Sequence, residues 1–484
     1  MARQLQLIRI NFTGGIISPG YLHLLLRIAA EAKVSELRFG LRQELFMEVP
    51  QAHLEQFATA CETGNISWQP AAGGQPNITS SYPGAGIFVA DSWLTEGIYK
   101  DVFDLFNYTP TLKINICDSQ QTFSPFFSGH LNWISSPYLN YWYLYIRQPG
   151  NDHTFCWPTL IYTNSIASVS RELERRLATE TPDMIAQRPP ESIHRPLDKA
   201  LELPPFHLPY YEGFNRQGNH YWLGIYRRHE VFPLGFLKDI CAVCLETGIG
   251  QLYATSWKSV IIKDIEPGHR RLWDYVLGKY NINVRHAANE LNWQIADNCA
   301  DSLILKRHII RHFDTADVRT YGLCFSIRLD ASGARFGSIL IRRQENRYQS
   351  RLKYMQRFEI LYKNDFNPNA GGLTVYRSDV LKEHLGPYIV ALCKHYYEKG
   401  SEQPVLQQYT MQQSVPVAGA VEKTLHQCPQ CFTVYDDAAG DPQQHIAAGI
   451  PFEELPASYN CFICGAGKED FVEVEAAALR HPAT

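Results

Sequence analysis

The segment GYLHLLLRIAAEAKVSELRFGLRQELFMEVPQAHLEQF at residues 20–57 matches residues 235–272 without a gap, at an offset of 215 positions. Leu37, for example, aligns with Leu252. Similarity of a chain to itself at a fixed offset indicates a duplicated structural unit. The sequence therefore predicts that one fold occurs twice within the first 400 residues, which we call the body.

Each copy predicts the same order of elements. After Pro19 and after Pro233, apolar residues recur at the i, i+3, i+4 spacing of an amphipathic helix. A strand follows, and then a second amphipathic helix and a short strand, expected at residues 54–61 and 65–68 in the first copy and at residues 272–277 and 281–284 in the second. Each copy is thus predicted to be half of an α+β sandwich, and a weaker likeness continues into a β-rich module after each copy.

The expected fold class is α+β, with a duplicated body followed by a small metal-binding domain. A Pro-rich polar segment separates the two copies, and a stretch of Gln, Ser, Pro, Val and Ala without periodicity reads as a flexible tether. The expected divisions are a first half-domain at 1–75, a first α/β module at 76–180, a connecting loop at 181–205, a second half-domain at 206–290, a second α/β module at 291–400, a linker at 401–421 and a C-terminal domain at 422–475, which we call the tail.

The composition excludes several classes of protein. The 484 residues carry 45 basic and 49 acidic side chains, a net charge of −4, and hydrophobic residues make up 45% of the chain. This balance argues against a disordered protein and against a strongly basic nucleic-acid binder. The N-terminus resembles no signal peptide, and no run of about 18 apolar residues occurs. We therefore expect a cytoplasmic protein with no membrane or nucleic-acid partner.

Charge divides unevenly between the body and the tail. The tail holds ten acidic and two basic residues, a net charge of −8, which leaves +4 for the rest of the chain. Opposite charges favour docking of the tail on the body or on a basic partner protein.

Four of the twelve cysteines lie in the tail, as Cys428-Pro-Gln-Cys431 and Cys461-Phe-Ile-Cys464. Two Cys-x-x-Cys pairs place four thiolates on two tight turns that can face each other, which suits a tetrahedral site for zinc or iron. From the spacing alone, a structural zinc ribbon and a redox-active iron site are both open.

The residues between the two pairs resemble those of rubredoxin. They include Val434-Tyr435-Asp436, Gly440-Asp441-Pro442 and the run from Gly449 to Pro456. The resemblance implies one iron bound by Cys428, Cys431, Cys461 and Cys464, single-electron transfer and redox partner proteins. It also implies a small aromatic core of Tyr435, Phe452, Tyr459 and Phe471. The tail departs from the family at three positions, with Phe432 in place of Gly, Tyr459 in place of Trp and Phe462 in place of Pro.

The body resembles the ferredoxin-like half-domains of siroheme nitrite and sulfite reductases. The resemblance rests on the order of elements, on the duplication and on Arg-x-x-x-Arg-Gln at residues 38–43. It implies that Arg38 and Arg42 face a siroheme or its anionic ligand. At a spacing of four on one strand both would point to the same face, with Gln43 on the opposite face. The alternative is that they are ordinary charged residues on an open sheet.

The cluster ligands of that family are missing here. The family binds a [4Fe–4S] cluster through a CxxxxxC pair and a CxxxC pair after the second half-domain, where this chain has only the single residues Cys299, Cys324 and Cys393. Cys241 and Cys244 lie at i and i+3 of a predicted helix and read as buried thiols. The sequence therefore predicts no [4Fe–4S] cluster and makes siroheme doubtful.

Three hypotheses of function follow. The leading one is an iron-binding electron-transfer protein with a rubredoxin module tethered to a reductase-like body, with a reductase as electron donor and an acceptor such as an assimilatory reductase. The first alternative is an active siroheme-dependent nitrite or sulfite reductase fed by the rubredoxin iron. The second is a zinc-ribbon scaffold. The sequence leaves open whether the body is an enzyme, and it leaves the oligomeric state open.

Overall fold

The structure is a computed structural model of the chain. The chain forms two compact units, the body at Met1–Gly400 and a C-terminal unit at Ser401–Thr484 that contains the tail. The structure describes residues 4–88, 93–121, 123–149, 153–284, 288–330, 336–344, 356–401, 424–429, 433–437, 440–441, 444, 446–447, 449–461 and 465–475.

Two five-stranded sheets form the two half-domains of the body. In spatial order, the first contains β15 (Phe232–Pro233), β3 (Glu36–Phe39), β4 (Glu44–Pro50), β1 (Leu5–Asn11) and β5 (Gln69–Pro70). The second contains β13 (Gly213–Gln217), β14 (His220–Ile225), β17 (Val260–Ile265), β16 (Leu252–Ala254) and β2 (Ile16–Ile17).

Each half-domain completes the sheet of the other. Strand β15 belongs to the second copy but pairs with β3 of the first, with Phe232 opposite Leu37. Strand β2 belongs to the first copy but pairs with β16 of the second, with Ile17 opposite Leu252. Since Ile17 and Phe232 are separated by the same 215 residues as the two copies, the exchange is reciprocal. Neither half-domain has a complete sheet without its duplicate.

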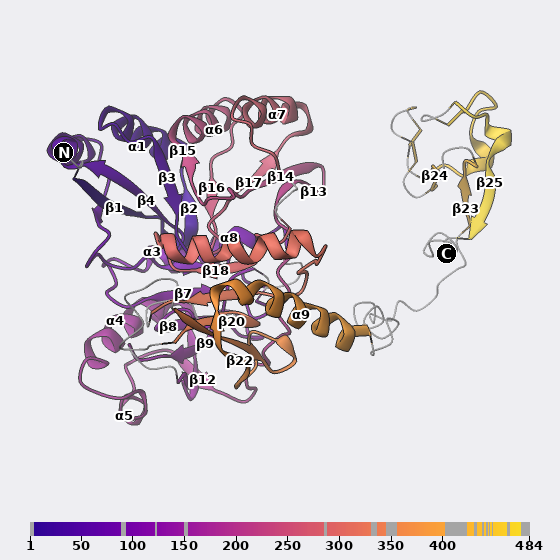
Figure 1. Ribbon diagram of the computed structural model, residues 1–484. Coiled ribbons are helices and arrows are strands. Elements are labelled where there is room, and N and C mark those ends of the chain that lie inside the picture. The colour runs from indigo at the N-terminus through magenta and orange to yellow at the C-terminus, as the bar shows by residue number, and fades with distance from the viewer. Residues whose placement is uncertain are drawn as a thin grey trace. The chain divides into compact units, whose positions relative to one another are not determined.

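Helices pack on the apolar faces of these sheets. They are α1 (Pro19–Glu31) and α2 (Leu54–Thr63) in the first copy, and α6 (Leu234–Glu246) and α7 (Arg270–Lys279) in the second. Helix α1 begins where the Ser18 hydroxyl accepts a hydrogen bond from the Tyr21 N–H. Helices α1 and α6 pack against each other in one continuous core and lie along one side of the body in Figure 1. The helices predicted after Pro19 and Pro233 are confirmed.

The short strands were placed less well by the sequence. The first lies at β5, just beyond the expected residues 65–68, and residues 281–284 form no strand. Their apolar side chains pack as loop residues beneath the helices, so the same hydrophobic pattern arises without strand pairing.

Each α/β module contains a mixed sheet. In spatial order, the first contains β12 (His194–Pro196), β11 (Thr159–Tyr162), β9 (Tyr141–Ile146), β8 (Leu131–Ser135), β7 (Ile114–Cys117) and β6 (Thr79–Ser80), with β10 (Phe155–Cys156) paired to β9. The second contains β18 (Trp293–Ile295), β19 (Phe325–Arg328), β20 (Ile339–Arg343), β21 (Arg357–Lys363) and β22 (Leu373–Leu381). In both sheets two parallel pairings are followed by an antiparallel one, so the duplication extends to these modules.

The helices of the modules are α3 (Glu96–Asp104) and α4 (Ile166–Arg176) in the first, and α8 (Ala300–Thr315) and α9 (Lys382–Ser401) in the second. The segment expected as a connecting loop at 181–205 contains helix α5 (Pro182–Gln187) and strand β12. Thr181 caps α5, and Ile185 within this helix is fully buried. Among the helices described, none has both the length and the apolar character needed to span a membrane.

The tail contains a three-stranded antiparallel sheet. In spatial order its strands are β24 (Val434–Tyr435), β23 (Thr424–Gln427) and β25 (Val472–Glu475). Tyr435, Phe452 and Tyr459 form a buried cluster, and Phe471 packs against it. The small aromatic core expected from the sequence is confirmed.

Candidate functional site

Two of the four tail cysteines lie in turns of the same construction. The Cys428 N–H donates a hydrogen bond to the carbonyl oxygen of Thr433 at 2.8 Å, and the Cys461 N–H donates to that of Ala466 at 2.7 Å. In each turn the acceptor is five residues beyond the cysteine, so the backbone folds back in the same way after both. Gly465 supplies the positive φ of 78° that the second turn requires.

The two turns bring their first cysteines into one buried cluster. Cys428 and Cys461 are 0% and 2% exposed and share a cluster with Ala466, against which Phe471 packs. Two buried thiols in one cluster are compatible with a thiolate metal site. Cys431 and Cys464, together with Phe432 and Phe462, lie outside the described residues. Their expected role as ligands stays a prediction.

The polar ends of the aromatic core are hydrogen-bonded. The Tyr435 hydroxyl donates to the Ile450 carbonyl at 2.7 Å, and the Tyr459 hydroxyl donates to a carboxylate oxygen of Asp441 at 3.1 Å. Burial, together with this carboxylate, raises the pKa of Tyr459 well above its ordinary value. The core that supports the cysteine turns is therefore held in one arrangement by hydrogen bonds as well as by packing.

In the body, Arg38 and Arg42 do not share a strand, so the expectation that they point to one face is wrong. Strand β3 ends at Phe39, and residues 40–43 form a tight turn in which the Gly40 N–H donates to the Glu44 carbonyl at 2.9 Å. Gln43 closes the turn with a positive φ of 62°. A spacing of four residues places side chains on one face only when the strand continues between them.

The guanidinium group of Arg42 is held by acceptors of the first α/β module. It donates to the Asn77 carbonyl at 2.6 and 3.2 Å, to the Ile114 carbonyl at 2.8 Å and to the Asn115 side-chain oxygen at 3.0 Å. Burial lowers the pKa of Arg42 to about 10, so it remains charged at neutral pH. Arg42 therefore joins the first half-domain to the adjoining module.

Arg38 has a different environment. Its side chain is 33% exposed, and its nearest carboxylate oxygen, on Glu48, is 4.0 Å away. The predicted binding of an anion or a tetrapyrrole by Arg38 and Arg42 stays a prediction. The structure places the two guanidinium groups in separate surroundings.

A buried ion network lies at the equivalent turn of the second copy, and sequence reasoning missed it. The Lys258 ammonium group is 2.8 Å from a carboxylate oxygen of Glu230 and 3.4 Å from one of Asp297, and Glu230 also pairs with Lys306 at 3.5 Å. Asp297 in turn accepts a hydrogen bond from the Leu41 N–H at 3.0 Å, which connects the network to the first copy. Its members are scattered along the chain, so no local spacing reveals them.

Within this network, the charged forms of Glu230 and Lys258 are favoured. Burial alone would raise the pKa of Glu230, but the ammonium groups of Lys258 and Lys306 together hold it below its ordinary value. Burial alone would lower the pKa of Lys258, but Glu230 and Asp297 together raise it. Both partners of the pair are therefore ionised at neutral pH.

Replacement of Glu44 by glutamine is expected to stabilise the chain at pH 8 and to have little effect near pH 4.5. Burial, followed by the charge of Asp297, raises the pKa of Glu44 from 4.5 to about 7, and one of its carboxylate oxygens has no hydrogen-bond partner among the described groups. Because the folded state favours the neutral acid, ionisation opposes folding increasingly as the pH rises from 4.5 to 7. Removing the charge should raise the unfolding free energy at pH 8 by about 3 kcal/mol.

Urea unfolding of both proteins across this pH range measures the effect. The matched control is Glu48→Gln, two residues further along β4, where the side chain is 49% exposed. A pH-independent difference for Glu44→Gln, or the same profile for both variants, would contradict the assignment.

All eight cysteines of the body lie in described segments. Six are buried, Cys156 is exposed and Cys299 is intermediate. Burial raises the pKa of Cys241 and of Cys393 to about 12, which disfavours the thiolate form that binds metals. Within the described parts of the chain, no three His, Cys, Asp or Glu side chains gather as a group that would hold a metal ion.

Comparison with known proteins identifies the tail. The family model described as Rubredoxin matches residues 425–471. Rubredoxin-2 of Chlorobaculum tepidum is 47% identical over 47 residues, which cover 10% of this chain and 90% of that protein. The high molecular weight rubredoxin of Moorella thermoacetica is 46% identical over 55 residues, covering 11% of this chain and 24% of that protein. An anaerobic nitric oxide reductase flavorubredoxin of Escherichia coli is 40% identical over 52 residues, 11% of each chain.

The body is recognised by its fold. The structure of the NirA protein of Mycobacterium tuberculosis superimposes with a TM-score of 0.58 and 14% sequence identity, covering 84% of this chain and 83% of that one. Identity this low establishes the fold alone, and it confirms the predicted α+β architecture of the body, which the NirA protein shares. Through its C-terminal residues 425–471, which follow a body of this architecture, the chain belongs to the rubredoxin family.

Proposed function

We propose that this chain is an iron-dependent electron-transfer protein in which Cys428, Cys431, Cys461 and Cys464 bind one iron. The observation that carries the proposal is the pair of equivalent turns that bring Cys428 and Cys461 into one buried cluster. Four thiolates on two such turns match the tetrahedral preference of iron with sulfur ligands. When bound, this iron supplies one-electron chemistry, alternating between the ferric and ferrous states.

The residues around the cysteines have two tasks in this function. Ala466 and Phe471 pack against the buried side chains of Cys428 and Cys461 and limit the access of water. The hydrogen bonds that close the turns hold the first cysteine of each pair in place before and after electron transfer, so little reorganisation is needed. A tail of this size has a small core, and metal binding is therefore expected to supply much of its stability.

The body is proposed to lack the coupled siroheme and [4Fe–4S] cluster of the reductases whose fold it shares. The described residues considered for these groups are engaged in other contacts, which supports this proposal. The Arg42 donors bind protein acceptors, Lys258 is paired with Glu230, and Glu44 is a buried carboxyl group. Most of the body cysteines, moreover, stand singly in the sequence and are buried. We assign the body the role of a platform for an electron donor and an acceptor such as an assimilatory reductase.

The compartment proposed is the cytoplasm. None of the eight body cysteines, all of them described, forms a disulfide. This agrees with a reducing environment, in which grouped cysteines bind metals more often than they form disulfides.

The visible spectrum and metal content of the purified full-length chain test the proposal. We expect one iron per chain and ferric-thiolate absorption bands that bleach on reduction and return on oxidation. An additional Soret band would support the siroheme enzyme instead. A colourless chain with one zinc, obtained despite ample iron during production, would refute both redox functions and support the zinc-ribbon scaffold.

A further inference from the structure

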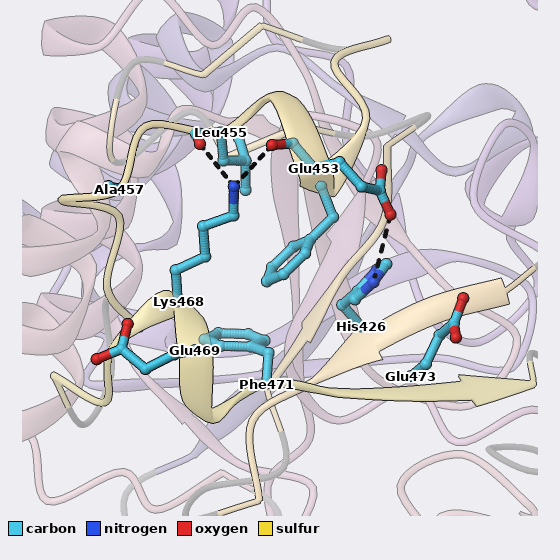
Figure 2. A pocket seen from close by; sticks show the side chains of 9 residues that line it. His426, Glu453, Leu455, Ala457, Lys468, Glu469, Phe471 and Glu473 are labelled. Atoms are coloured by element: carbon cyan, nitrogen blue, oxygen red, sulfur yellow. Dashed lines mark hydrogen bonds and ion pairs between the residues drawn. The ribbon is translucent and has the colours of Figure 1, made fainter.

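The tail has an open pocket of about 560 Å³ next to its cysteine turns. Figure 2 shows the side chains that line it, which come from β23, β25 and the segments between them, including the short 3-10 helices Phe452–Glu454 and Lys468–Asp470. Phe452, Leu455, Ala457 and Phe471 form its apolar surface, and His426 stacks on Phe452 with the ring centres 3.9 Å apart and the planes within 9°. His426 therefore covers one face of Phe452, whereas Phe471 is only half-buried at the pocket.

Three carboxylates surround this aromatic surface. Glu453, Glu469 and Glu473 all line the pocket and are exposed, with the Glu453 side chain 73% exposed. The one lysine of the lining, Lys468, donates to the carbonyl oxygens of Glu453 and Leu455 at 2.8 and 2.7 Å (Figure 2). With the histidine neutral, the lining carries a net charge of −2.

The pocket already accommodates an ammonium group on one side. The Lys468 nitrogen lies 5.6 Å from the centre of the Phe452 ring, within the range of a cation–π contact. Phe471 and the carboxylates of Glu453, Glu469 and Glu473 complete the lining of the pocket (Figure 2). A side chain with an apolar stem and a cationic end matches both its shape and its charge.

One residue, Phe471, contacts both the pocket and the buried cysteines of the tail. Phe471 lines the pocket and also packs against the cluster of Cys428 and Cys461.

We propose that this pocket receives an arginine or lysine side chain from the surface of a second, basic redox protein, and that electrons pass between that protein and the iron centre in the docked complex. The inference rests on the proposed function and adds the partner's chemistry. In each encounter one electron leaves the reduced chain, which is oxidised, and enters the oxidised cofactor of the partner, which is reduced. No bond forms and no proton moves.

The test uses the full-length chain, reduced under argon and mixed with ferric cytochrome c, a basic haem protein, in a stopped-flow instrument. Glu453→Lys should lower the second-order rate constant about fivefold at low ionic strength, and Glu453→Lys/Glu469→Lys about twentyfold. The matched control is Glu454→Lys, which makes the same charge change at the next exposed residue but lies outside the pocket lining. It should lower the rate less than twofold, and raising the salt concentration should remove all these differences.

Two further measurements keep the outcomes distinct. The ferric absorption bands of each variant show whether its iron site is intact, and oxidation by the small anion ferricyanide should not slow in any variant. Equal slowing by Glu453→Lys and Glu454→Lys, or no slowing by either, would overturn the docking site while leaving the electron carrier in place. Absence of reducible bands in the unmodified chain would overturn the docking site together with the function on which it rests.

Discussion

Replacement of Cys461 by serine is expected to abolish the ferric-thiolate bands and to lower the iron content of the full-length chain from one per molecule to less than about 0.1. Cys461 is 2% exposed and shares a cluster with Cys428, so a hydroxyl group at this position would remove one of the four proposed sulfur ligands. Without metal, the small aromatic core of the tail should no longer hold its fold. Absorption spectroscopy, metal analysis and limited proteolysis measure these losses.

The matched control replaces a thiol that the proposed site does not use. Cys156 is exposed on β10 in the body, and Cys156→Ser should retain both the spectrum and the iron. The circular dichroism of the body should be unchanged in both variants, because the two compact units have separate cores. Retention of the native bands by Cys461→Ser would refute the ligand assignment.

Replacement of Arg42 by methionine is expected to lower the unfolding free energy of the body by about 2–4 kcal/mol. The substitution keeps the apolar stem but removes the donors that satisfy the Asn77 and Ile114 carbonyl oxygens and the Asn115 side chain. Asn77 and Asn115 are at most 3% exposed, so water cannot readily replace the guanidinium group. Equilibrium unfolding in urea, followed by tryptophan fluorescence, measures the change.

Arg38→Met provides the comparison within the same motif. Arg38 is a third exposed and has only a distant carboxylate, so its loss should change the unfolding free energy by less than about 1 kcal/mol. Similar small effects of both substitutions would show that Arg42 is not a structural element between the half-domain and the module. Such a result would favour the prediction that both arginines serve a ligand.

The features that could be predicted from the sequence are those encoded over short stretches or by repetition. The Cys-x-x-Cys pairs predicted two tight turns, and the described cysteines lie in such turns because each closing hydrogen bond spans only five residues. The aromatic residues near them predicted the tail core for the same reason. The offset of 215 residues predicted the duplicated body, since a repeat is visible without knowledge of its structure.

Two features of the body were missed or misplaced because their local sequence pattern suggested another structure. Arg38 and Arg42 were expected on one strand because their spacing is consistent with a strand, but the turn at residues 40–43 separates them. Helix α5 was missed because the Pro-rich composition around it is typical of a loop, although Ile185 is fully buried there. In both cases burial and backbone hydrogen bonds outweighed the local pattern.

By itself, the sequence determined that a cysteine-paired tail of the rubredoxin type follows a body made of two related halves. Only the tertiary structure decided that each half completes the other's sheet through β2 and β15. It also decided that Arg42 donates its hydrogen bonds to the adjoining module, and that Lys258, Glu230 and Asp297 form one buried network. The physical reason is the range of the interactions. A turn around two cysteines is specified by neighbouring residues, whereas a buried ion pair or an exchanged strand exists only after the chain has brought distant segments together.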